Sequence, residues 1–271
     1  MGITAIMRRM RSIVLLALFI AVMSGLPDTL SKPQTNPESP PSPRLRRASR
    51  APSTDSEALR VLFIGNSLTS FNDLPRLVER IADAGGKVRI RSKSVTANDF
   101  SLEDHWNGGS AQKAIRRGPL DWVILQQGPS SQPDSQVLLR DYVERFDRVI
   151  REANAKTALY MVWPSRARYR DMAGVITSYT NAAKSVEGTL LPAGLAWHLG
   201  FQREPELPLY GEDQFHPSRL GSYLAALVIY EGLTGEPTEG LPPAVRDRTL
   251  TPPRLHLLTD IAHQAVTAKR P

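Results

Sequence analysis

From about residue 57 to its end, the sequence alternates between short apolar segments and stretches that carry apolar residues at helical spacing. Strands separated by helical patterns indicate βαβ units, in which the strands run parallel and the crossovers are right-handed. The pattern therefore predicts an α/β fold built on a parallel sheet. The predicted strands cover residues 59–64, 87–95, 122–125, 158–162 and 189–191, and the predicted helices cover residues 73–84, 111–117, 134–153, 175–186, 218–233 and 255–268.

The first predicted strand ends in the sequence Gly65-Asn66-Ser67, which places a serine between a strand and a helix. Glycine and asparagine tolerate the backbone angles of a sharp turn, so the strand is expected to end there. The helix that follows begins near Asp73. Open α/β sheets place their sites at the carboxyl ends of the strands, where Ser67 would lie. Taken alone, the segment is equally typical of a serine in a loop or at a helix cap.

A second polar motif, Asp213-Gln-Phe-His216-Pro217, precedes a late predicted helix. Pro217 suits the first position of a helix, which would put His216 at the cap. Asp213 could then accept the Nδ1 hydrogen of His216, fix its tautomer and leave Nε2 to act as a general base. A serine hydroxyl needs such a base before it becomes a nucleophile. An Asp-x-x-His motif alone is also a common helix start, but together with Ser67 it favours a catalytic triad.

These two motifs resemble the first and last sequence blocks of the SGNH hydrolases, also called GDSL-type esterases and lipases. Asn66 stands where that family more often has aspartate. The resemblance covers about residues 59–233, and the segments 102–106 and 191–197 are similar to an uncharacterised bacterial branch. It implies a three-layer α/β/α sandwich with a flavodoxin-like parallel sheet, and the hydrolysis of esters without a metal or other cofactor.

The resemblance also implies three donors for the oxyanion that forms on the substrate carbonyl. They are the backbone N–H of Ser67, a backbone N–H from the turn after the second strand, and a side-chain amide after the third strand. In this sequence the second donor is assigned to Asn98. For the third, the family's asparagine is replaced by Gln126, with Gln127 as the reserve and Ser130 as a further candidate.

Another polar cluster, Glu103-Asp104-His105, has the composition of a metal or acid–base site. Neighbouring positions on a regular element point in different directions, so a structural role is favoured. The sequence has no Gly-x-Ser-x-Gly elbow, no Gly-x-Gly-x-x-Gly motif and no Gly-Lys-Ser/Thr loop. Their absence argues against an α/β-hydrolase of the elbow type and against dinucleotide or triphosphate binding.

The N-terminal part of the chain predicts export. Residues 1–25 combine a basic start with an apolar run of about 11 residues, the pattern of a signal peptide, and an uncleaved membrane anchor is the alternative. Residues 26–56 are rich in Pro, Ser, Thr and Arg, which predicts a disordered linker. The folded domain is therefore assigned to residues 57–271, and a periplasmic or extracellular location is expected.

Composition narrows the partners. Most of the formal charge of +7 lies in residues 1–56, and the rest of the chain shows no basic stripe interleaved with aromatic residues, which argues against nucleic-acid binding. The chain has no cysteine, which excludes disulfides, thiolate metal sites and a lipidated cysteine. Any membrane association would therefore come from residues 1–25.

The first hypothesis is an exported serine esterase that acts on a small-molecule or carbohydrate ester, with an acetyl group on a carbohydrate as the substrate that fits export. The alternative is a non-catalytic module on the same fold that binds a glycan or lipid. A phosphate-binding domain that uses Gly65-Asn66-Ser67 at a helix start is a third reading, but it leaves Asp213 and His216 without a role.

Overall fold

The structure is a computed structural model in which residues 58–268 are described. The predicted export segment 1–25 and linker 26–56 lie outside the described residues. None of the helices within residues 58–268 combines the length and apolar character needed to span a bilayer.

The core is a five-stranded parallel sheet with the strand order β2-β1-β3-β4-β5. This is the flavodoxin-like order, so the predicted fold class is confirmed. The first and third strands are buried in the middle of the sheet, which explains their unbroken apolar sequences. The strands are β1 (Leu59–Gly65), β2 (Ile90–Thr96), β3 (Trp122–Leu125), β4 (Lys156–Tyr160) and β5 (Thr189–Leu191).

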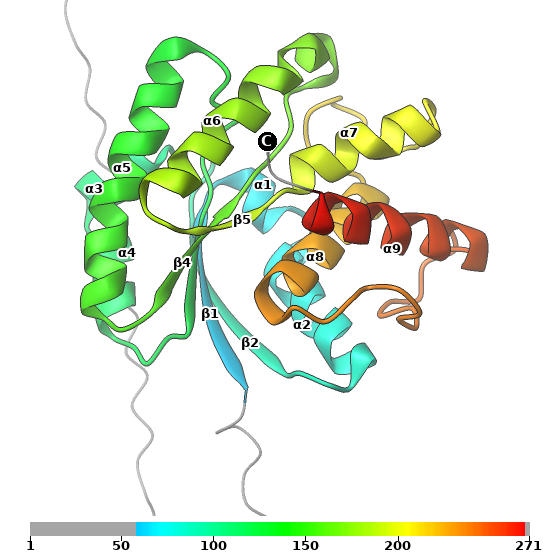
Figure 1. The fold of residues 1–271 in the computed structure, drawn as a ribbon, viewed down its shortest axis with the longest axis horizontal. Helices are drawn as coiled ribbons and strands as arrows, with labels where there is room; N and C mark the ends of the chain where they lie inside the picture. The colour runs from blue at the N-terminus through cyan, green and yellow to red at the C-terminus, as the bar shows by residue number, and fades with distance from the viewer. Residues whose placement is uncertain (1–57, 269–271) are drawn as a thin grey trace, which may run out of the picture. The chain divides into compact units, whose positions relative to one another are not determined.

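Helices cover both faces of the sheet. Figure 1 shows α3 to α6 on one side and α2, α8 and α9 on the other. The helices are α1 (Ser67–Ser70), α2 (Leu74–Gly85), α3 (Leu102–Gly108), α4 (Ser110–Arg116), α5 (Pro133–Glu152), α6 (Met172–Ser185), α7 (Ala193–Arg203), α8 (Arg219–Thr234) and α9 (Pro252–Thr267), with short 3-10 turns η2 (Phe71–Asp73) and η3 (Arg166–Asp171).

Three helices and several element ends differ from the sequence-based prediction. The predicted set lacks the one-turn helix α1 as well as α3 and α7, and β2 begins at Ile90 rather than at residue 87. Helix α3 is only seven residues long, too short to show a clear apolar period, and it is fixed by a capping box in which Ser101 and Asp104 bond each other's backbone N–H. Short elements of this kind depend on caps and tertiary packing rather than on periodicity.

The strand order places the ends of β1 and β3 beside each other. The chain leaves the sheet in opposite directions from these two strands, which makes this edge the topological switch point of the fold. Ser67 follows β1 and Gln126 follows β3, so both residues lie at the edge where flavodoxin-like proteins bind their ligands.

Candidate active site

Ser67 is the first residue of the one-turn helix α1, directly after the turn that ends β1. Asn66 caps this helix, because its side-chain oxygen accepts the N–H of Leu68 at 3.1 Å. Asn66 is also buried, and its Nδ2 donates to the carbonyl of Phe100 in the turn after β2. The cap therefore fixes where the half-buried Ser67 side chain begins and ties this turn to the neighbouring strand end.

Gln126 locks the same turn from the end of β3. Its Oε1 accepts the backbone N–H of Asn66 at 2.8 Å and the Thr69 hydroxyl at 2.7 Å. Its Nε2 donates to Asn66 Oδ1 at 2.9 Å and to the Gln127 carbonyl at 2.7 Å. A Cβ on Gly65 would lie 2.3 Å from Gln126 Oε1, so only glycine leaves room for this contact. The sequence Gly65-Asn66 is thus required by packing as well as by the turn.

The loop before α8 brings His216 to Ser67. His216 Nε2 lies 2.9 Å from Ser67 Oγ, and His216 Nδ1 lies 2.5 Å from Asp213 Oδ2. The Asp213 carboxylate can only accept, so Nδ1 carries the hydrogen and Nε2 is left to accept the hydrogen of the serine hydroxyl. The three side chains form one continuous hydrogen-bond chain with the geometry of a nucleophile, a base and an orienting carboxylate.

Asp213 also shapes the loop that carries His216. Its second oxygen accepts the backbone N–H groups of Phe215 and His216 at 3.0 and 2.8 Å. The hydrogen bond from His216, followed by the bond from the Phe215 N–H, lowers the pKa of the Asp213 carboxyl below its ordinary value. Asp213 therefore stays ionised over the pH range in which a neutral imidazole can act as a base.

Contacts from the β4–α6 connection hold this loop in place. The indole N–H of Trp163 donates to the Phe215 carbonyl at 3.2 Å, and the Arg166 N–H donates to the Gln214 carbonyl at 2.9 Å. The buried Trp163 ring stacks on Trp197 with centroids 3.5 Å apart, so the donor is fixed by the core. No local sequence pattern predicts these long-range contacts.

The start of α8 differs from the prediction. Ser218, not His216, is the cap, since its hydroxyl accepts the Gly221 N–H at 3.0 Å, and Pro217 precedes the helix in an antiparallel bridge with Tyr210. A hydroxyl caps a helix better than the residues before it, so the helix begins at Arg219. His216 is left in the loop, where its ring can turn toward Ser67.

No protein-family model and no curated protein matches this chain, but solved structures do. A candidate SGNH hydrolase from Slackia heliotrinireducens is 26% identical, with a TM-score of 0.55 over 65% of this chain and 99% of that one. A DUF4886 family protein from Bacteroides uniformis is 18% identical, with a TM-score of 0.67 over 78% and 95%. A catalytic mutant of an acetylxylan esterase from Geobacillus stearothermophilus is 15% identical, with a TM-score of 0.52 over 71% and 98%.

The chain has the fold of the SGNH hydrolases. The resemblance inferred from the two end blocks is thus confirmed at the level of the structure. It also gives a reference for the one part of the site that departs from the family pattern, the donors for an oxyanion.

The two backbone donors of the predicted oxyanion hole stay a prediction. The N–H groups of Ser67 and Asn98 make no hydrogen bond with any residue in the described part of the chain. The Asn98 turn is held beside the Ser67 turn, because the Ala97 N–H donates to the Gly65 carbonyl at 3.3 Å. The absence of a partner among the described residues is consistent with the predicted role of both groups.

The prediction of a third donor from Gln126 needs correction. Both hydrogens of its amide are donated inside the protein, and the bond from the Asn66 N–H fixes which atom of the amide is the oxygen. The side chain is 1% exposed. Gln126 holds the turn that carries Ser67 and has no hydrogen left for an oxyanion.

The reserve candidates are committed as well. Gln127 is buried, accepts the Leu102 N–H at 3.1 Å and donates its Nε2 to Ser130 Oγ at 3.0 Å. The Ser130 hydroxyl in turn donates to the Gly128 carbonyl at 2.9 Å. These bonds hold the loop after β3 together.

The polar cluster on α3 is divided among three partners. Asp104 caps the helix, Glu103 accepts the hydroxyl of Tyr142 at 2.7 Å, and the buried His105 bonds the Gly65 carbonyl at 2.9 Å. Burial lowers the pKa of the His105 imidazole, which therefore stays neutral and donates this bond. Within residues 58–268, no group of three or more acidic or histidine side chains could hold a metal ion.

The imidazole of His216 is flanked by two phenylalanine rings. Phe71 stacks on it with centroids 4.6 Å apart and an interplanar angle of 19°, and Phe215 contacts it in an edge arrangement with centroids 5.1 Å apart and an angle of 65°. Phe71 is 41% exposed, so it forms part of the rim of the site. The two rings restrict the rotation of the imidazole. Residue spacing gives no indication of the Phe71 contact.

A cavity of about 350 Å³ opens beside this loop. It is lined by Phe215, by the loop after β3 and by the start of η3, including Ser130, Ser165 and Arg168. The guanidinium of Arg168 is held by Asp171, at 2.6 Å. The cavity is of the size that a small acyl or sugar group needs, and it reaches the loop of His216 through Phe215.

Proposed function

We propose that this protein is a serine hydrolase that cleaves carboxylic esters through Ser67, His216 and Asp213. The observation that carries the proposal is the unbroken chain of hydrogen bonds from Ser67 Oγ through His216 to Asp213, at 2.9 and 2.5 Å. The fold, shared with lipases and acetylxylan esterases, supports the same reaction class.

In the first half of the reaction, Ser67 Oγ attacks the ester carbonyl while His216 Nε2 takes the hydroxyl proton. The negative charge that forms on the carbonyl oxygen is stabilised by the N–H groups of Ser67 and Asn98. The imidazolium then donates its proton to the leaving alcohol oxygen, and the acyl group remains on Ser67. The Asp213 carboxylate supports the positive charge on His216 in both steps.

In the second half, a water molecule takes the place of the alcohol. His216 Nε2 accepts a proton from the water as its oxygen attacks the acyl-enzyme carbonyl. The collapse of this second intermediate breaks the bond to Ser67 Oγ, which receives the proton back from His216. The products are a carboxylic acid and the free enzyme, with no cofactor consumed.

For the substrate we propose a short acyl group, acetyl in particular, on a carbohydrate. Acetylxylan esterases are among the structural matches, and the 350 Å³ cavity beside Phe215 suits a small group. Export through residues 1–25 belongs to the same proposal, because it would bring the enzyme to polysaccharides outside the cytoplasm.

A fluorophosphonate probe tests the proposal, since it labels a serine only where a base activates the hydroxyl. We expect the wild type to be labelled and to hydrolyse p-nitrophenyl acetate, and Ser67→Ala to lose both properties. The matched control is Ser70→Ala, which removes an exposed serine from the same short helix and should retain both. A wild type that is neither labelled nor active would favour a non-catalytic binding module, and an active Ser67→Ala would exclude Ser67 as nucleophile.

A further inference from the structure

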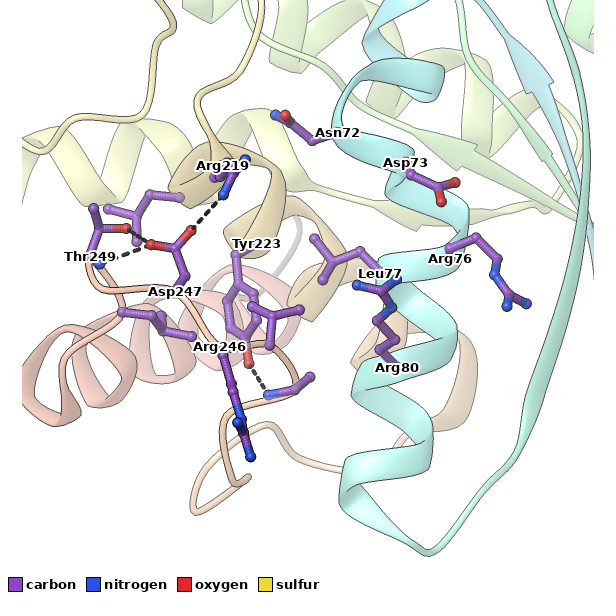
Figure 2. Close-up of a pocket in the computed structure, with 14 residues that line it drawn as sticks. Asn72, Asp73, Arg76, Leu77, Arg80, Arg219, Tyr223, Arg246, Asp247 and Thr249 are labelled. Atoms are coloured by element: carbon purple, nitrogen blue, oxygen red, sulfur yellow. Dashed lines mark hydrogen bonds and ion pairs between the residues drawn. The ribbon is translucent and has the colours of Figure 1, made fainter.

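A second, larger cleft of about 600 Å³ lies next to the proposed catalytic site. Figure 2 shows it between α2 on one side and α8 with the loop before α9 on the other. Its floor is apolar, because the side chains of Leu77, Leu220 and Leu250 are buried there. The cleft is therefore a formed concavity with a largely apolar floor rather than a flat stretch of surface.

The walls of this cleft are mainly basic. Four arginines line it, against two aspartates, Asp73 and Asp247. Asp247 is already occupied, since Thr249 donates to it from its N–H and its hydroxyl at 2.9 and 2.7 Å, and Arg219 lies 3.9 Å away. The bonds from Thr249 lower the pKa of the Asp247 carboxyl. The four arginines are Arg76, Arg80, Arg219 and Arg246.

Two of these arginines have no partner among the described residues. Arg76 is paired with the buried Glu79, but neither Arg80 nor Arg246 makes an ion pair or hydrogen bond with any residue from 58 to 268. Figure 2 shows Arg80 projecting from the same side of α2 as Leu77. Guanidinium groups bind carboxylate and phosphate oxygens in a paired, planar geometry, and the excess of arginine over aspartate in this cleft favours anionic ligands.

The floor adds one more donor. The Tyr223 hydroxyl accepts the Ala244 N–H at 3.2 Å, and no acceptor for its own hydrogen is present in the described part of the chain. Tyr223 is 3% exposed, and burial raises the pKa of its phenol, so the hydrogen is retained at neutral pH. A polar ligand in the cleft would meet this donor below and the two arginines at the sides.

The cleft begins where the proposed catalytic site ends. Asn72 lines it, and the preceding residue, Phe71, stacks on His216. Asn72 Nδ2 donates to the carbonyls of Pro217 and Ser218 at 3.0 and 3.2 Å, which joins the two walls beside His216. Arg80 lies six residues beyond Leu74, the first residue of α2, which is roughly 9 Å along the helix axis. An extended oligosaccharide held at Arg80 would span this length toward Ser67.

We infer that this cleft binds carboxylate-bearing sugar residues, so that the substrate is an ester of an acidic oligosaccharide rather than of a neutral one. This inference rests on the proposed esterase function and adds the class of the alcohol part. Uronic acid residues would place carboxylates at Arg80 and Arg246 and hydroxyl oxygens at Tyr223, while an esterified residue of the same chain reaches Ser67.

The experiment compares two substrates, O-acetylated oligogalacturonate and O-acetylated xylo-oligosaccharide, with wild type, Arg80→Gln/Arg246→Gln and Arg148→Gln. Arg148 is the matched control, because it is an exposed arginine on α5, in the opposite helix layer, with no ion pair or hydrogen bond to another described residue. We expect the double variant to raise KM for the acidic substrate about tenfold relative to the neutral one, since each guanidinium loses a charge-assisted contact. The control should leave the ratio at the wild-type value.

Binding is measured separately from turnover, so that a failure of the acidic-ligand inference and a failure of the proposed esterase function give different results. In a Ser67→Ala background, calorimetry with de-esterified oligogalacturonate should show binding that weakens with added salt and is lost in the double variant. Equal KM ratios in all three proteins, or oligogalacturonate binding that ignores Arg80 and Arg246, would overturn the inference. A wild-type protein that does not turn over p-nitrophenyl acetate would instead contradict the proposed function.

Discussion

Replacing Gln126 with alanine is expected to destabilise the fold as well as to slow the reaction. The side chain makes four hydrogen bonds in a fully buried position. At about 1 kcal/mol net for each bond, the free energy of unfolding should fall by about 4 kcal/mol. Because three of the bonds hold Asn66 and Thr69, the Ser67 turn would relax and kcat would fall with the stability.

Urea unfolding followed by circular dichroism, with kcat on p-nitrophenyl acetate, measures both effects. Gln126→Met keeps most of the side-chain volume and so separates lost hydrogen bonds from a cavity. Thr69→Val removes one of the four bonds and should cost about 1 kcal/mol. If Gln126→Ala unfolded at the wild-type urea concentration while kcat fell about 100-fold, the amide would be acting on the oxyanion. The role of Gln126 in holding the Ser67 turn would then be wrong.

The remaining predictions concern two pH-sensitive groups. Asp213→Asn should keep the loop, since Oδ1 still accepts two N–H groups. The asparagine amide would, however, donate to Nδ1 of His216 and put the imidazole hydrogen on Nε2, which should lower kcat on the order of 10⁴-fold. Glu212→Gln is the neighbouring control. His105 has a lowered pKa, so the unfolded state takes up its proton first, and stability should fall as the pH drops below about 6.5. Urea unfolding at pH 7.5 and 5.5 should show that His105→Gln loses this dependence while the exposed His256→Gln keeps it.

Periodicity was sufficient to predict the sheet. All five strands and the long helices come from apolar patterns that local sequence displays, and a parallel sheet with short connections allows few strand orders. The same patterns failed for α3 and α7, because α3 is short and fixed by a capping box, and α7 is buried among its neighbours without a clean apolar face. Capping chemistry at Ser101 was the available clue for α3.

The sequence predicted the proposed triad but not the contacts around it. The triad could be named because its members, Ser67, Asp213 and His216, lie in local motifs of recognisable chemistry. Gln126 was assigned to the wrong partner, since its contacts with Asn66 and Gly65 depend on the strand order rather than on any spacing. The basic cleft was missed for the same reason: its arginines come from α2, α8 and the loop before α9, and they are neighbours only after folding.

The corrected role of Gln126 makes substrate binding in the basic cleft more important for the proposed reaction. Without Gln126, the predicted oxyanion donors are the N–H groups of Ser67 and Asn98, and losing one donor typically costs about 100- to 1,000-fold in rate. Binding energy from remote parts of a substrate can offset such a loss, provided that it is used to hold the ester against the nucleophile. A small ester such as p-nitrophenyl acetate cannot reach Arg80 or Arg246, whereas an acidic oligosaccharide could. On this reasoning the enzyme should depend on the alcohol part of its substrate more strongly than an SGNH hydrolase with three oxyanion donors.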